Sequence, residues 1–406
     1  NSALNGNTAT IKDADTLKAL ARMVNSGKDS MAGKTIMLGA DIRLNNDAVP
    51  TSGNQWTPIG TEKNPFKGTF TGYSRSGGYA AISDLSDDLF GVVHNSKTKI
   101  QYVTISGGTG RLVNTLKSGT VENCMSTAEV TGAGGGLVGT STGTVKNSYY
   151  YNENCKNIVA VSGDGTITNC YYLADTSTWG QTGDTGARTE AEFKAGRVTW
   201  ELNGKDAVYR YNVTTYWSMG ENDLPCLETY NAVYELTLTV NGTLPEGASL
   251  QLGDASIKVL TDGNTQYVYR ANSYGAPMVP VSAEVPDGYQ VMYSPNAPTN
   301  GKFKIDGFTK ANNYYTVEFV KGDISWYEAN KDSKSYAFKT ADELVGFSLL
   351  VNGSTGTRVD FEGWTLTLAN DINLDGIAWT PIGQSNAFSG TFDGKGHTIE
   401  DMSANV

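Results

Sequence analysis

Few residues of this chain could carry chemistry, and their spacing matches no common catalytic or metal-binding pattern. Neither of the two histidines begins the HExxH motif of zinc proteases, because His94 precedes Asn95 and His397 precedes Thr398. The four cysteines contain no closely spaced pair that would suit zinc. They are Cys124, Cys155, Cys170 and Cys226. We expect small buried thiols, with a disulfide left open, and neither a metal nor a cofactor.

Acidic residues could in principle hydrolyse a glycosidic bond or bind calcium. The densest acidic cluster of the first half contains Asp84, Asp87 and Asp88, in a Ser- and Asp-rich stretch typical of a solvated turn. The segment from Asp371 begins like an EF-hand loop, but Ile382 stands where that loop needs a bidentate glutamate. We interpret both segments as polar turns, so the sequence predicts no catalytic residue and no metal ligand.

The tyrosines are stronger candidates for a binding site than the acidic residues. Tyr149, Tyr150 and Tyr151 follow one repeated segment, and Tyr171 and Tyr172 follow the next. Alternation along a strand would turn some of these rings outward, where an aromatic row can stack on sugar rings or contact a protein. The alternative is that the rings pack beneath loops or beneath the segment that ends the repeat.

The composition excludes some classes of function. Lys plus Arg is 31 and Asp plus Glu is 42, which gives a net charge of −11 and argues against nucleic acid as a partner. No run approaches the ~18 apolar residues that span a bilayer, so we expect no membrane insertion. The first ten residues are polar, which fits a protein whose leader has been removed or a fragment of a longer chain.

A short repeat sets the expected architecture. Val121, Val145 and Ile167 recur at intervals of 24 and 22 residues, each preceded by Gly-Thr. Asparagines follow two positions later, at Asn123, Asn147 and Asn169. Such periods are typical of stacked units, and a parallel β-helix fits them best. We expect the aliphatic side chains to form an inward column and the asparagines to align at a corner, where Asn tolerates left-handed backbone.

A long repeat shows that the chain contains one module and the beginning of a second. Five blocks recur in the same order. They are 15–27 with 342–353, 33–38 with 363–368, 41–44 with 371–374, 56–60 with 379–383, and 66–72 with 388–394. The first block of each copy has apolar residues at helical spacing, beginning at Leu17 and at Leu344. We expect each helix to cap the open end of its repeat.

The remaining segments differ in character. The repeat decays after Leu173, where a Thr-Glu-Ala-Glu pattern from Thr189 predicts a short helix, and the segment ending at Leu227 is expected to close the repeat. Short alternating runs separated by turns fill residues 232–321 and indicate a small, loosely immunoglobulin-like β-sandwich. The predicted domains are therefore 1–231, 232–321 and 322–406.

Residues 135–139, Gly-Gly-Leu-Val-Gly, followed by Gly-Thr-Val-Lys-Asn at 143–147, resemble the GLUG-motif repeats of bacterial surface proteins. Residues 89–91 look like a degenerate earlier member, and 379–383 with 388–399 resemble the segment that precedes such repeats. The resemblance covers about 1–230 and 323–406. It implies a right-handed β-helix in secreted or wall-bound, adhesin-like proteins. Related repeats also accompany immunoglobulin A-cleaving metallopeptidases.

Together these patterns predict an all-β chain: a right-handed parallel β-helix with a helical N-terminal cap, a sandwich spacer and the beginning of a second β-helix. The expected function is a non-catalytic structural or adhesive segment of a surface protein. Its partner would be a host or neighbouring-cell protein or glycan, with self-association through the second copy as a further possibility. The alternatives are a glycan-binding or glycan-active flank, carried by the tyrosines, and an accessory segment of a surface peptidase.

Overall fold

The computed structural model describes residues 4, 6–44, 56–154, 157–161, 164–178, 185–194, 196–204, 217–227, 233–242, 244–252, 264–270, 278–286, 289–295, 298–304, 313–353 and 357–404. The chain divides into two compact units, Asn1–Val233 and Tyr234–Val406. Strands dominate both units and helices are few, so the all-β class is confirmed. The finer division at 231/232 and 321/322 stays a prediction.

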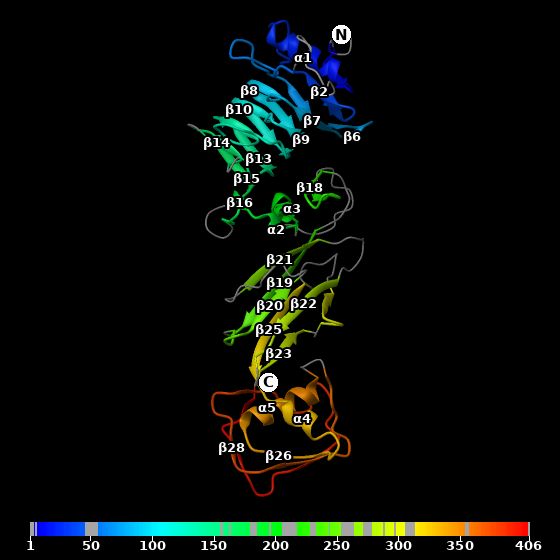
Figure 1. The fold of residues 1–406 in the computed structure, drawn as a ribbon, viewed down its shortest axis with the longest axis vertical. Helices are drawn as coiled ribbons and strands as arrows, with labels where there is room; N and C mark the ends of the chain where they lie inside the picture. The colour runs from blue at the N-terminus through cyan, green and yellow to red at the C-terminus, as the bar shows by residue number, and fades with distance from the viewer. Residues whose placement is uncertain are drawn as a thin grey trace. The chain divides into compact units, whose positions relative to one another are not determined.

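The first unit is built around one large curled sheet in which all pairings are parallel (Figure 1). Its strands are β1 (Thr8–Ile11), β2 (Thr35–Leu38), β3 (Ile42–Arg43), β4 (Thr69–Thr71), β7 (Ala81–Leu85), β8 (Phe90–Gln101), β9 (Thr104–Gly108), β10 (Val113–Glu122), β11 (Met125–Ser126), β12 (Val138–Ser141), β13 (Thr144–Tyr150), β14 (Val159–Val161), β15 (Thr166–Leu173) and β16 (Gly186–Arg188). Two hairpins, β5 (Tyr73–Ser74) with β6 (Gly78–Tyr79) and β17 (Ser218–Met219) with β18 (Pro225–Cys226), accompany the sheet.

One face of the sheet carries a continuous column of side chains in register. Val121 is the Cα partner of Val145, and Val145 is the partner of Ile167. The column also extends toward the N-terminus, and all members except half-buried Ile167 are buried. In order, it contains Ala9, Ile36, Phe70, Ile100, Val121, Val145 and Ile167. Each repeat therefore buries its apolar residue against the residues above and below it, which stabilises the fold by about 1.5–3 kcal/mol for each fully buried Val, Ile or Phe.

A second face begins after a corner and carries its own column. Its members are Ile42, Ile82, Ile105, Ser126, Tyr150, Tyr172 and Ala187. The corner residues preceding this face are Tyr102, Asn123, Asn147 and Asn169, with φ angles of 56°, 53°, 47° and 51°. Asn169 Nδ2 donates to Asn147 Oδ1 at 2.9 Å. Asparagine suits these corners because it tolerates left-handed backbone and can bond to its neighbour.

A third face explains the Gly-Leu-Val-Gly segment. Phe90, Val113, Val138 and Val159 pair in sequence along β8, β10, β12 and β14. A Cβ on Gly139 would lie 2.5 Å from the Asn114 carbonyl oxygen, and a Cβ on Gly91 would lie 2.4 Å from that of Gly60. Both glycines therefore let the chain approach the backbone of the neighbouring repeat. The segments 89–91 and 137–139 occupy the same register position, two repeats apart.

The described residues of the first unit contain three α-helices: α1 (Ala14–Asn25), α2 (Glu190–Lys194) and α3 (Arg197–Leu202). The side chain of Asp13 accepts a hydrogen bond from Thr16 N and caps α1. Leu17, Leu20 and Val24 of α1 are buried in the same core as the sheet columns. The helix expected near Thr189 is α2, in which Thr189 and Glu192 exchange backbone and side-chain hydrogen bonds.

The second unit contains two small sheets and then the second copy of the long repeat. A four-stranded sheet joins β21 (Asn264–Arg270), β19 (Val233–Asn241), β25 (Tyr314–Lys321) and β23 (Tyr289–Ser294) in that order. A three-stranded antiparallel sheet joins β20 (Ser249–Leu252), β22 (Met278–Glu284) and β24 (Lys302–Lys304). Two of the turns that separate the alternating runs of residues 232–321, at 262–264 and 286–288, lie largely outside the described residues.

The second copy reproduces the pairing of the first. Its elements are α4 (Ser325–Ala329), β26 (Ser335–Phe338), α5 (Ala341–Asn352), β27 (Thr365–Leu368), β28 (Ile372–Asn373), β29 (Ala378–Trp379), β30 (Thr391–Asp393), β31 (Ile399–Glu400) and β32 (Ser403–Ala404). Tyr336, Leu366 and Phe392 pair in sequence, as Ala9, Ile36 and Phe70 do. Thr340 and Glu343 form a capping box at the start of α5.

In both copies, an equivalent asparagine at the end of the helix bonds to the Trp-Thr-Pro-Ile-Gly block. Asn25 Nδ2 donates to the Pro58 carbonyl at 2.9 Å, and Asn25 Oδ1 accepts from Gly60 N at 2.7 Å. Asn352 Nδ2 donates to the Pro381 carbonyl at 2.9 Å, and Asn352 Oδ1 accepts from Ser385 N at 3.0 Å. The bond from the helix asparagine to the proline carbonyl is therefore common to both copies, and it holds the helix against this block.

Replacement of Asn25 by alanine is expected to lower the free energy of unfolding of the first unit by about 2 kcal/mol. The substitution leaves the Pro58 carbonyl and the Gly60 amide without their partner, and stranding such groups costs roughly 1–3 kcal/mol. Urea unfolding measures the change, with Asn7→Ala at an exposed position as the control. An Asn25→Ala variant as stable as that control would contradict the interpretation.

Candidate functional site on the flank of the curled sheet

The expected row of exposed tyrosines is not formed, because three of its five rings are buried. Tyr149, Tyr150 and Tyr171 are each 0% exposed, and Tyr151 and Tyr172 are half-buried. Tyr150 and Tyr172 belong to an inward column of the sheet. The Tyr150 hydroxyl donates to the Ala128 carbonyl at 2.8 Å, which satisfies its only polar group inside the core.

Tyr149 and Tyr171 do point away from that core, as alternation predicts, but another layer of the protein covers them. They pack in a separate apolar cluster with Met125, Phe193, Val198, Leu202 and Trp217. The Tyr149 hydroxyl donates to the Pro225 carbonyl at 2.6 Å. The segment after the last repeat thus folds back over the outer face of the sheet. The alternative of rings lying beneath the terminal segment is the one observed.

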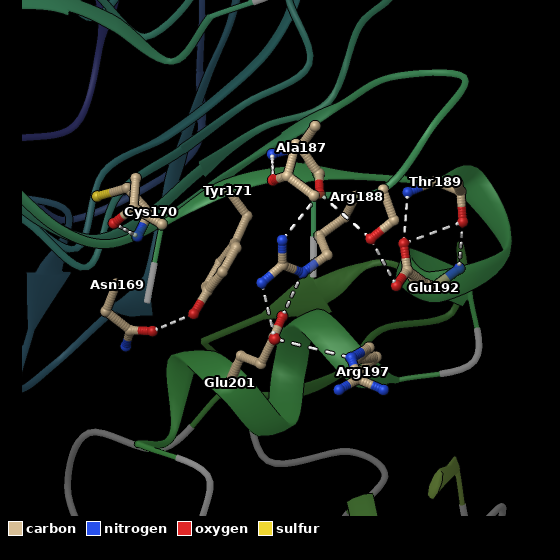
Figure 2. A network of polar contacts seen from close by, with 12 residues as sticks. Asn169, Cys170, Tyr171, Ala187, Arg188, Thr189, Glu192, Arg197 and Glu201 are labelled. Carbon is tan, nitrogen blue, oxygen red and sulfur yellow. Dashed lines mark hydrogen bonds and ion pairs between the residues drawn. The ribbon is translucent and has the colours of Figure 1, made fainter. Parts of the chain in front are cut away.

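A buried ion network holds this covering segment in place (Figure 2). Arg188 at the end of β16 makes a bidentate pair with Glu201 of α3, through Nε and Nη2 at 2.8 Å each. The two side chains are 2% and 1% exposed. Arg188 Nη1 donates to the Ala187 carbonyl at 2.8 Å, and the guanidinium lies 4.6 Å from the centre of the Tyr171 ring. A buried charge pair needs such additional partners to offset its desolvation.

Two further residues connect the network to its neighbours. Arg197 Nε lies 3.7 Å from Glu201 Oε1, and burial lowers the pKa of this arginine. Asn169, at the corner of the last repeat, accepts a hydrogen bond from the Tyr171 hydroxyl at 2.5 Å. Figure 2 shows Glu201 between the two guanidinium groups. Both carboxylate oxygens of Glu201 are therefore used to hold α3 against the sheet.

The interpretation of residues 84–88 as a solvated turn is wrong for Asp88, because its side chain is buried. Asp88 is buried, its Oδ1 accepts from Arg111 N at 2.7 Å, and its Oδ2 lies 3.7 Å from Arg111 Nη1. Burial raises the pKa of Asp88, and the contacts with Arg111 oppose that rise. Asp84 pairs with Arg43 at 2.5 Å. Asp87 is exposed, and its carboxylate accepts from Asp88 N at 2.8 Å.

The described cysteines are free thiols: Cys124 and Cys170 are buried, and Cys226 is partly buried. Burial raises the pKa of Cys124 and of Cys170 to about 12, so both remain protonated and unreactive at neutral pH. Cys155 lies outside the described residues. Within the part of the chain that the structure describes, no three His, Cys, Asp or Glu residues group as metal ligands would, and no helix is long and apolar enough to cross a membrane.

In the second unit, Asp371 has a structural role. Its Oδ1 accepts from Thr398 N at 2.8 Å and lies 3.3 Å from His397 Nδ1. The Thr398 amide and then His397 lower the pKa of this exposed carboxyl. Asp41 makes the equivalent bond to Ala81 N at 2.8 Å. The aspartate thus aligns two neighbouring repeats in both copies.

An aromatic cluster that the sequence analysis missed lies near the first corner. Tyr73 and Tyr79 are cross-strand partners in the β5–β6 hairpin, with ring centres 4.9 Å apart. Tyr79 lies 6.0 Å from the ring of Tyr102. Tyr73 is 39% exposed, whereas Tyr79 and Tyr102 are half-buried. The available signal was the longer loop of the first copy, which places two tyrosines where the second copy has a short turn.

Tyr73 can present its ring face and hydroxyl to a ligand, and Tyr79 and Tyr102 support it from a half-buried position. Burial, and then Tyr102 and Tyr73, raise the pKa of Tyr79 to about 12, so its hydroxyl keeps its proton at neutral pH. Burial also raises the pKa of Tyr102, with Glu122 as a second cause. Among the described residues of the first unit, Tyr73 is the only large apolar side chain that is exposed.

Comparison with known proteins adds little. No protein-family model matches the chain, and a comparison with curated proteins finds no match. Among solved structures, the chain is similar to one described as a putative immunoglobulin A1 protease from Bacteroides ovatus. The identity is 14%, the match covers 54% of this chain and 92% of the other, and the TM-score is 0.35. A likeness of this size decides neither fold nor function.

Proposed function

We propose that this chain is a structural and adhesive segment of a large secreted or wall-anchored bacterial surface protein, and that it has no catalytic role of its own. Its repeats are of the GLUG type. Its partner is a protein or glycan on a host or neighbouring cell. The observation that carries the proposal is that the buried charged groups bond to one another. Glu201 pairs with Arg188, and Asp88 pairs with Arg111, so these groups stabilise the fold.

In this proposal the curled sheet is a right-handed parallel β-helix. Three columns of side chains, each in parallel register, support this geometry, and nearly all parallel crossover connections are right-handed. The helix α1 caps its first coil. The two sheets of the second unit form a β-sandwich spacer, supported by the stacking of Phe303 of β24 on Tyr315 of β25 at 4.1 Å.

A site for acid–base chemistry would keep at least one carboxylate available to a substrate. Glu201 has both oxygens bonded to Arg188, and Asp88 is bonded to Arg111. These contacts fix the covering segment and the third face of the sheet. They favour a scaffold over an enzyme.

Self-association through the second copy is part of the proposal. Phe70 of β4 is 0% exposed because β8 of the next repeat pairs with β4 and covers it. The equivalent Phe392 of β30 is 37% exposed, and β27 is the only strand paired with β30 among the described residues. An open strand edge with an exposed aromatic residue favours pairing with another chain.

Adhesion is tested with beads coated with residues 1–406, incubated with cultured epithelial cells. Several-fold more beads should remain bound than with an albumin coating. The chain should also leave immunoglobulin A and a panel of polysaccharides intact. Retention at the albumin level would contradict the adhesive role. Cleavage by the wild-type chain would overturn the non-catalytic part.

A further inference from the structure

The β5–β6 hairpin is an insertion that the repeat itself does not require. The Ala80 amide donates to the Gly72 carbonyl at 2.8 Å, and the His397 amide donates to the Gly394 carbonyl at 2.8 Å. The following amides, of Ala81 and Thr398, donate to the equivalent aspartates. Residues 73–79 therefore stand where the second copy has only 395–396. In the second copy, a turn of two residues is enough to make this connection.

The residue beneath this hairpin is also unusual for its position. Tyr102 has φ 56° at a corner where the next three repeats carry asparagine. Left-handed backbone costs a residue with a bulky side chain roughly 1–2 kcal/mol, and asparagine adopts it more readily. An asparagine at this corner would cost less free energy, but the tyrosine places its ring 6.0 Å from the ring of Tyr79. Strain kept at a half-buried residue beside the exposed ring of Tyr73 is typical of a functional site.

We propose that Tyr73, Tyr79 and Tyr102 form a stacking site for a pyranose ring of a neutral glycan. This inference rests on the adhesive function proposed above and names the class of ligand that the segment holds. Tyrosine rings offer an apolar face to the C–H groups of a sugar and hydroxyls to its polar edge. Figure 1 shows the hairpin at the side of the curled sheet, beside β7.

The surroundings favour a sugar over a protein and a neutral sugar over an acidic one. A stable protein interface needs about 800 Å² on each partner, with a buried apolar centre. In the described part of the first unit, Tyr73 is the only exposed large apolar residue, and the hairpin tip next to it is Arg75, Ser76 and Gly77. The carboxylate of Glu122 lies near enough to Tyr102 to raise the pKa of that tyrosine, and it disfavours an acidic sugar there, although Lys146 pairs with it at 2.8 Å.

A glycan array tests the proposal first, with heparin and polygalacturonate as acidic comparisons. The full chain should bind one or more neutral glycans, and calorimetry with the best of them then gives affinities. Tyr73→Ala should lower the affinity about tenfold or more, and Tyr73→Phe should lower it less, because the ring remains. Replacing residues 73–79 by Lys-Gly, as in the second copy, should abolish binding without unfolding the chain.

Two variants separate the site from its role in folding. Tyr102→Asn copies the next three corners, so it should weaken binding while the unit remains folded. Tyr314→Ala removes a 50% exposed ring of the second unit and should leave the affinity unchanged. The proposal is overturned if the chain binds no neutral glycan, binds only the acidic ones, or keeps its affinity without residues 73–79. Bead adhesion that persists without sugar binding would overturn this inference alone.

Discussion

Replacing Glu201 by alanine is expected to lower the free energy of unfolding of the first unit by about 3–5 kcal/mol. The substitution leaves the Arg188 guanidinium buried without its bidentate partner, and an uncompensated buried charge costs that much. The loss of stability should be largest in the segment that contains Arg188 and Glu201. Hydrogen exchange read on peptides from residues 164–204 should therefore show a large loss of protection, because α3 no longer holds the last repeat.

Two comparisons make this result specific. Glu190→Ala removes an exposed pair with Lys194 on the neighbouring helix and should change the stability by less than about 1 kcal/mol. Combining Arg188→Met with Glu201→Leu removes the bidentate pair and should recover part of the lost stability, because the partly buried Arg197 still loses its contact with Glu201. A Glu201→Ala chain as well protected as the Glu190→Ala chain would show that the network does not hold the segment in place.

Replacing Phe70 by alanine is expected to cost about 3–5 kcal/mol, whereas the same change at Phe392 should cost less than half of that. The two residues are equivalent in sequence and in register. Phe70 is 0% exposed, and its ring centre lies 5.2 Å from that of Phe90 in the next repeat. Phe392, in contrast, is 37% exposed. Urea unfolding of the two variants measures the difference. Equal losses would contradict the idea that the following repeat supplies the burial.

Phe392→Ser should have its main effect on association instead of on stability. If the open edge of β30 pairs with another copy, sedimentation should show concentration-dependent self-association of the wild-type chain. The Phe392→Ser chain should then remain monomeric over the same range. A wild-type chain that stays monomeric at the highest accessible concentration would remove self-association from the proposed function.

The sequence indicated the parallel stacking because its signals are local and periodic. Val121, Val145 and Ile167 recur at the spacing of one repeat, and parallel register puts such residues in contact. Asn123, Asn147 and Asn169 signalled the corner because few residues adopt left-handed backbone at low cost. The helix caps at Asp13 and Thr340 were equally local. β1 and β26, which precede those helices, were not predicted.

The fate of the tyrosines could not be deduced in the same way. Alternation predicted that some of the five rings face outward, but it cannot reveal that Trp217 and Pro225, more than sixty residues later, cover the ring of Tyr149. The Tyr73, Tyr79 and Tyr102 cluster was missed for a related reason. The first two residues pair across a hairpin and the third comes from the next repeat, so no single pattern in the sequence connects them.

By itself, the sequence determined the repeat: the inward column of Val121, Val145 and Ile167, the asparagine corners, and the recurrence of five blocks in a second copy. Those properties depend on the period of the strand and on the backbone preferences of Gly and Asn, which any stretch of chain carries with it. Only the tertiary structure decided which outward residues reach solvent. Exposure depends on what distant segment packs over a residue, and Arg188 and Glu201 fix that segment through a contact that no local pattern encodes.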